Sequence, residues 1–99
     1  PLASADDAGS CHFHGNTPAK EAVVVGCAKQ RIDALVAKTK LESSWKSVPL
    51  DKALVVEGKN KKEWKLTFIN PQATDTKKKT LYLFYTLSGN FIAANFTGQ

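Results

Sequence analysis

Residues 81–96 read LYLFYTLSGNFIAANF, two apolar runs separated by Ser88-Gly89-Asn90. Runs rich in aromatic and branched side chains that flank a short turn of Ser, Gly and Asn are typical of an antiparallel hairpin. The stretch therefore predicts strands over residues 81–87 and 91–96. Large apolar side chains occupy both alternating faces of these strands, so both faces need cover.

A second hairpin is expected just before this one. Residues 52–57 and 63–69 are β-rich runs, and Gly58-Lys59-Asn60 between them has the composition of a turn. Asn70-Pro71 ends the later run. Short connections make consecutive strands neighbours, which predicts a four-stranded antiparallel meander.

The sheet is preceded by a predicted helix. Thr17 offers an N-cap hydroxyl and Pro18 suits the first helical position, so we expect a helix from Pro18 to about Lys38. Cys27 lies off its apolar stripe, which predicts a position on the flank of the helix. The expected fold is α+β, one N-terminal helix packed on the meander sheet, with the general architecture of cystatin-like folds. The stripe consists of Glu21, Val24, Val25, Ala28, Ile32, Leu35 and Val36.

Length and the N-terminal sequence predict the domain organisation and the compartment. At 99 residues, 42% of them hydrophobic, the chain has room for one domain, and no apolar run approaches the roughly 20 residues of a membrane span. Ala3-Ser4-Ala5 before Asp6 is typical of a signal-peptide cleavage site. We therefore expect a signal-peptide remnant (residues 1–5), an N-terminal arm (6–17) and a single domain (18–99) in a periplasmic or secreted protein.

The chain has two cysteines, Cys11 and Cys27. In an exported protein, two cysteines predict a disulfide, which here would tie the N-terminal arm to the helix. In a reducing compartment both would be free thiols.

Between the cysteines, His12 and His14 are the candidate metal ligands. Imidazoles two residues apart on an extended segment project to the same side, which suits Zn²⁺, Cu²⁺ or Ni²⁺. Asp6, Asp7 and the amine of Asp6 could complete the shell. With reduced cysteines, Cys11, Cys27 and one histidine would instead form a thiolate-rich site. The alternative is that both histidines are surface residues beside a structural disulfide.

A second candidate site is the sheet face away from the helix. Tyr82, Phe84 and Phe96 are expected there, as candidate partner-binding residues. Residues 41–50 with Trp45, the N-terminal arm with Phe13, or another molecule must cover this face, and the last option implies a protein partner or a homodimer. The alternative to metal binding is therefore a protein-interaction or inhibitor-like module that uses this face and needs no metal.

The net charge of +5 is concentrated between residues 59 and 79, which hold seven lysines and two acidic residues. The lysines lie at the two ends of one predicted strand, so they do not form one continuous groove. Arg31 is the only arginine. Both observations argue against nucleic-acid binding. The chain lacks G-x-S-x-G, H-E-x-x-H and C-x-x-C, and we expect a non-enzymatic protein with no catalytic residue.

Three stretches resemble a family of small exported bacterial proteins of unknown function. They are CHFHG (11–15) with PAKEAVVVGCAKQR (18–31), EWKLTFINP (63–71) and TLYLFYTLSGNFIAANFTG (80–98). The resemblance covers nearly the whole mature chain and implies a periplasmic domain. It supplies no catalytic or binding residue.

Overall fold

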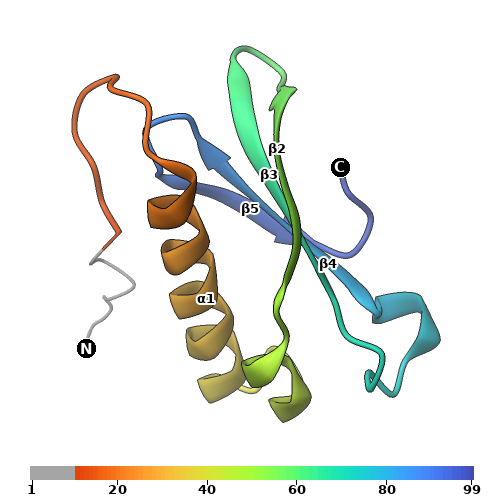
Figure 1. Ribbon diagram of the computed structural model, residues 1–99. Helices are drawn as coiled ribbons and strands as arrows, with labels where there is room; N and C mark the ends of the chain where they lie inside the picture. The colour runs from red at the N-terminus through yellow and green to blue at the C-terminus, as the bar shows by residue number, and fades with distance from the viewer. Residues whose placement is uncertain (1–10) are drawn as a thin grey trace.

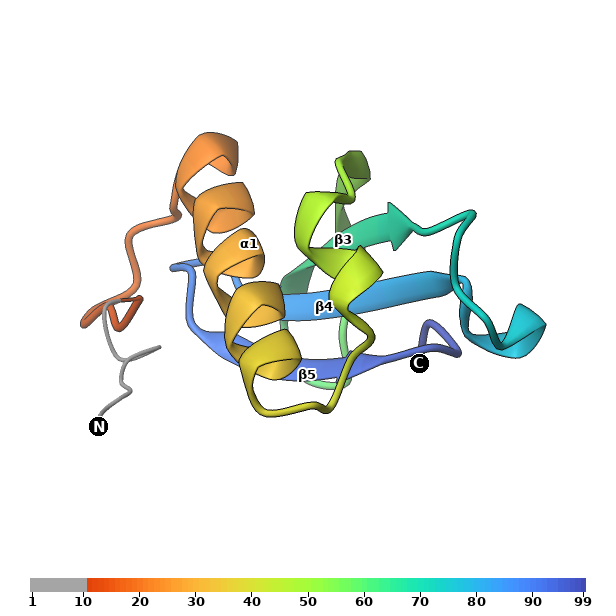
Figure 2. The ribbon, with the colours of Figure 1, turned by 90° about the horizontal axis from the view of Figure 1, so that it is seen from below.

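The structure is a computed structural model that describes residues 11–99 (Figure 1). The strands form one antiparallel sheet in the order β2-β3-β4-β5, and α1 packs across one face of it (Figures 1 and 2). The predicted α+β fold, a helix on a four-stranded meander, is confirmed. The elements are α1 (Glu21–Ala37), the 3-10 helix η1 (Ser43–Ser47), β2 (Leu50–Glu57), β3 (Lys62–Ile69), the 3-10 helix η2 (Thr76–Lys78), β4 (Thr80–Thr86) and β5 (Phe91–Asn95).

The core lies between α1 and the face of the sheet that it covers, here called the helix face. Val24, Ala28 and Ile32 of α1 are buried there, as their helical spacing predicts. Trp45 of η1 closes the same core. From the sheet, the helix face contributes Leu66, Phe68, Leu81, Leu83 and Tyr85.

The helix begins three residues later than predicted. Lys20 is its N-cap residue, in an extended conformation and without a side-chain hydrogen bond, so Thr17 does not cap α1. The Ala19 N–H instead donates to the carbonyl of Leu87, at 2.7 Å. This bond ties the preceding residues to the β4–β5 turn and keeps them out of the helix.

Cys27 lies off the apolar stripe of α1, on the side that the disulfide joins to the N-terminal segment, and it is buried there. It is only 5% exposed and belongs to the core. The reason is that Cys11 and Phe13 of the N-terminal segment pack against the same cluster and extend the core over this side of α1.

The opposite side of the sheet, the outer face, is covered differently from the prediction. Trp45 and Phe13 both pack on the helix face. The outer face is covered instead by Lys65, whose Nζ lies 4.9 Å from the Tyr82 ring centroid, and by Gly98, where a Cβ would come 3.3 Å from the Tyr82 ring. Asn95 Oδ1 accepts bonds from the N–H groups of residues 97 and 98 and turns this segment back onto the sheet.

Phe96 is not on the outer face. Its ring packs on the helix face, with its centroid 6.3 Å from that of Trp45. The cause is an irregularity in β5. Tyr85 pairs with Phe91 but Phe84 pairs with Ala93, so one extra residue reverses the alternation for the rest of the strand.

Candidate functional site

From here on, the arm means residues 11–20, which contain no helix or strand and lead into α1. Its residues alternate: Cys11 and Phe13 are half-buried against the core, while His12 and His14 are exposed. This alternation is that of an extended backbone, which sends successive side chains to opposite sides. The two histidines therefore lie on the solvent side of the arm.

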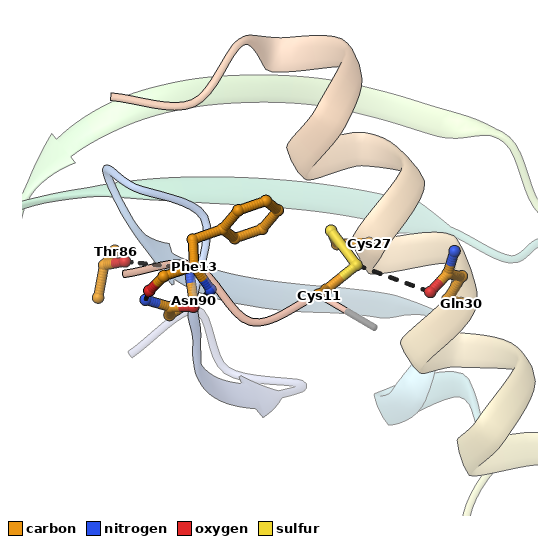
Figure 3. Close-up of a disulfide and its surroundings, with 6 residues drawn as sticks. All are labelled: Cys11, Phe13, Cys27, Gln30, Thr86 and Asn90. Carbon is orange, nitrogen blue, oxygen red and sulfur yellow. Dashed lines mark hydrogen bonds between the residues drawn. A yellow bond between two sulfur atoms is a disulfide. The ribbon is translucent and has the colours of Figure 1, made fainter. Parts of the chain in front are cut away.

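A disulfide makes the first attachment of the arm (Figure 3). It joins Cys11 to Cys27 with a Cα–Cα distance of 5.8 Å, as the cysteine count predicts. Closing a loop with a sequence separation of 16 stabilises the folded state by about 3 kcal/mol in the chain-entropy model. The bridge also removes both sulfurs as metal ligands, so the thiolate-rich alternative does not describe this oxidised form.

Asn90 of the β4–β5 turn makes the second attachment (Figure 3). The Phe13 N–H donates to Asn90 Oδ1 at 2.8 Å, and Asn90 Nδ2 donates to the Phe13 carbonyl at 2.8 Å. The backbone N–H of Asn90 donates in turn to Thr86 Oγ1 at 3.0 Å. One amide side chain thus satisfies both backbone groups of Phe13, as a neighbouring strand would.

The Phe13 ring fits the turn because residue 89 is glycine. Gly89 has φ +104°, a conformation that side chains disfavour, and a Cβ there would come 3.1 Å from the Phe13 ring. The bond from Ala19 to Leu87 completes the set of attachments. The turn therefore holds the arm at Phe13, between the two exposed histidines, and at Ala19, after them.

The histidines lie together, as their spacing predicts. The ring centroids of His12 and His14 are 4.8 Å apart with an interplanar angle of 83°. Within residues 11–99, no third histidine, cysteine, aspartate or glutamate joins them in a group that could hold a metal. The other proposed ligands, Asp6 and Asp7, lie outside the described residues, as does the predicted signal-peptide remnant. The described donor set is a pair of imidazoles.

A small cavity of about 10 Å³ adjoins the disulfide. The Tyr85 hydroxyl beside it is buried and has no hydrogen-bond partner among the described residues. Burial raises the pKa of Tyr85 to about 12, against the opposing effect of the nearby Arg31 guanidinium. Arg31 also stacks on Phe91, 3.8 Å from the ring centroid, and so seals the edge of the core.

The predicted partner-binding residues do not form one surface. Phe84 is only 8% exposed, Tyr82 is half-buried beneath Lys65, and Phe96 lies on the other face. The rings therefore offer no continuous apolar patch on the outer face.

The lysine clusters lie at opposite ends of the sheet, as predicted: Lys59, Lys61 and Lys62 at the β2–β3 hairpin, and residues 77–79 after the far end of β3 (Figure 1). The first cluster lines an open groove of about 1270 Å³, which Gly15 and Asn16 of the arm also line.

Sequence reasoning missed Asn90, Arg31 and Tyr85. Asn90 was visible as the last residue of a Ser-Gly-Asn turn. Its side-chain bonds, however, reach a residue 77 positions away, and no local pattern reports them.

No helix in the described part of the chain is long and apolar enough to cross a membrane. Neither the curated proteins nor the solved structures include a match to this sequence, so the cystatin-like comparison stays a prediction. One family model does match, a family of unknown function (DUF6488), over residues 2–99. A match over nearly the full chain shows membership, and the protein therefore belongs to the DUF6488 family.

Proposed function

We propose that this protein is a non-enzymatic binding domain that holds a divalent transition-metal ion through His12 and His14. The observation that carries the proposal is the contact between two exposed imidazoles on an attached arm, with centroids 4.8 Å apart. Neutral imidazole is a preferred ligand of Cu²⁺, Ni²⁺ and Zn²⁺.

The attachments matter because ordering a flexible segment costs free energy that would be subtracted from metal affinity. Fixing one residue costs about 1–2 kcal/mol in backbone entropy. Here the disulfide at Cys11 and the Asn90 bonds at Phe13 already hold the backbone on either side of His12. The folded protein therefore presents the imidazole pair with most of this cost already met by folding.

The donor set favours Cu²⁺ among the three candidate ions. For a given set of nitrogen ligands, affinity rises from Ni²⁺ to Cu²⁺ and falls again at Zn²⁺. Because the Phe13 N–H is bonded to Asn90, this amide does not supply a further nitrogen. Water, or the carboxylates of Asp6 and Asp7, would take the remaining positions.

The disulfide supports a place for this activity outside the cytoplasm. Disulfides persist in oxidising compartments and are rare in the cytosol of most organisms. A periplasmic or secreted location is therefore part of the proposal.

The test is a titration of the oxidised protein with Cu²⁺, and separately with Zn²⁺ and Ni²⁺, followed by NMR amide signals. We expect saturable changes confined to the arm and the β4–β5 turn, with Cu²⁺ bound most tightly. The chain has only two histidines, so the double variant His12→Ala/His14→Ala removes every imidazole. Equal metal affinity in this variant would contradict the proposal and leave the histidines as surface residues.

A further inference from the structure

Strand β2 is an outer strand of the sheet with one edge free. It pairs with β3 on one side and has no strand on the other within residues 11–99. Leu54 is 50% exposed and Val55 is 47% exposed, although they point to opposite faces. Free backbone groups next to exposed apolar side chains are the features on which a further strand pairs.

The register shows which backbone groups reach this edge. The Gly58 N–H donates to the Lys61 carbonyl at 2.8 Å, so this pair is bonded within the hairpin. Bonded pairs alternate along an antiparallel ladder, and the register from Glu57 to Lys52 has no irregularity. The backbone groups of Ala53, Val55 and Glu57 therefore point away from β3, toward the free edge.

The other outer strand, β5, is protected where β2 is not. β5 is a five-residue strand with an extra residue at Ile92, and the guanidinium of Arg31 covers its Phe91. Short length and irregular pairing are the usual means by which proteins block a sheet edge. In β2 the irregularity lies before Lys52, which leaves the uncharged residues 53–56 in a regular strand.

We infer that a second copy of this chain pairs with β2, antiparallel and edge to edge, so that the two sheets become one. In such a pair, opposite residues share a face, which restricts the register. Centring the pair on Leu54 would set the charged Lys52 opposite the apolar Val56 of the partner copy, twice by symmetry. Centring it on Val55 avoids this mismatch.

The register centred on Val55 also matches the side chains on both faces. Val55 meets its own counterpart on the helix face, and Leu54 meets Val56 of the partner copy on the outer face. Ala53 comes opposite Glu57 of the partner copy, so the paired residues 53–57 all lie within the part of β2 whose register is regular. Self-complementarity of the apolar positions is what an isologous interface requires.

The test is sedimentation velocity of the full oxidised chain at increasing concentration, with a chelator present to exclude metal-bridged association. We expect a concentration-dependent dimer. Val55→Lys places two ammonium groups together on the symmetry axis and should weaken the dimer by roughly tenfold or more. Val23→Lys is the matched control, because Val23 is equally apolar and 41% exposed but belongs to α1 and not to β2, and it should leave the dimer unchanged.

A cysteine variant tests the register. Val55→Cys should form an interchain disulfide between the two introduced thiols on mild oxidation, whereas Leu54→Cys should not, because residue 54 faces residue 56 of the partner copy. Peptide mapping identifies the linkage and verifies the native Cys11–Cys27 bridge. A monomer at concentrations up to about 1 mM, a dimer that Val55→Lys does not weaken, or cross-linking at residue 54 instead of 55 would overturn the inference.

Discussion

At the scale of single residues, Asn90 positions the candidate site although it is not one of the proposed metal ligands. Its amide both accepts from and donates to the backbone of Phe13, the residue between the two histidines. The amide supplies a donor and an acceptor side by side, whereas an ionised carboxylate of the same size supplies acceptors only. The arrangement of the imidazoles therefore depends on an amide in a distant turn.

Replacing Asn90 should loosen the arm. Asn90→Ala removes both bonds to Phe13, and we expect a loss of about 1–3 kcal/mol in the free energy of unfolding, measured by urea denaturation. Asn90→Asp keeps the acceptor but sets a carboxylate against the Phe13 carbonyl, so it should not restore stability. Asn60→Ala, at an exposed asparagine in the β2–β3 turn, is the control and should change stability by less than about 0.5 kcal/mol. Equal effects at the two asparagines would contradict this assignment.

Tyr85 should make stability fall at alkaline pH. Its hydroxyl has a pKa of about 12 in the folded protein against 10.0 for the ordinary value. Below pH 10 the phenol is neutral in both states. Between pH 10 and 12 the phenol of the unfolded chain releases its proton while that of the folded chain retains it. Deprotonation lowers the free energy of the unfolded state alone, so the free energy of unfolding falls as the pH rises.

The measurement is the free energy of unfolding from pH 9 to pH 12 in matched variants. Tyr85→Phe should remove part of the decline, while Tyr82→Phe, at the half-buried tyrosine, should retain it. Lysine deprotonation affects all three proteins alike and is removed by the comparison. Parallel curves for wild type and Tyr85→Phe would show that burial of this hydroxyl has no such effect.

At the scale of elements, the arm packs against one side of the core, and covalent and noncovalent bonds attach it at different residues. The disulfide acts at Cys11, the Asn90 bonds act at Phe13, and a backbone bond acts at Ala19. Loss of one attachment should therefore loosen the arm and leave α1 and the sheet folded.

Removing the disulfide tests this division. Cys11→Ala/Cys27→Ala should lower the free energy of unfolding by about 2–4 kcal/mol, mainly through the entropy of the unfolded chain. Amide hydrogen exchange should quicken in residues 11–20, with protection retained in β3 and β4, which form the centre of the sheet. Uniform loss of protection throughout the sheet would instead show that the arm is required for the whole fold.

At the scale of the whole molecule, the sheet could be predicted because residues close together in the sequence define each of its hairpins. Alternating side chains and short turns define each hairpin, and the observed strand ends lie within two residues of the predicted ones. The helix start could not be predicted, since the bond from Ala19 to Leu87 competes with the capping residues. The face of Phe96 could not be predicted either, since one extra residue in β5 reverses the alternation.

Some features of the candidate site could likewise be predicted from the sequence, and others could not. The pairing of Cys11 with Cys27 and the convergence of the histidines followed from counts and spacing. The cover of the outer face by Lys65 and Gly98 depends on contacts that only the complete fold creates.

The separation between Phe13 and Asn90 also sets an order of events during synthesis. A ribosome completes Phe13 long before Asn90, which lies 77 residues later, whereas Cys27 follows Cys11 by only 16. The disulfide partners are therefore both available early, while the amide that orients the histidines is made almost last. In an oxidising compartment the first third of the chain already holds both cysteines of the covalent loop. The two imidazoles take their fixed arrangement only once the β4–β5 turn with Asn90 is also present.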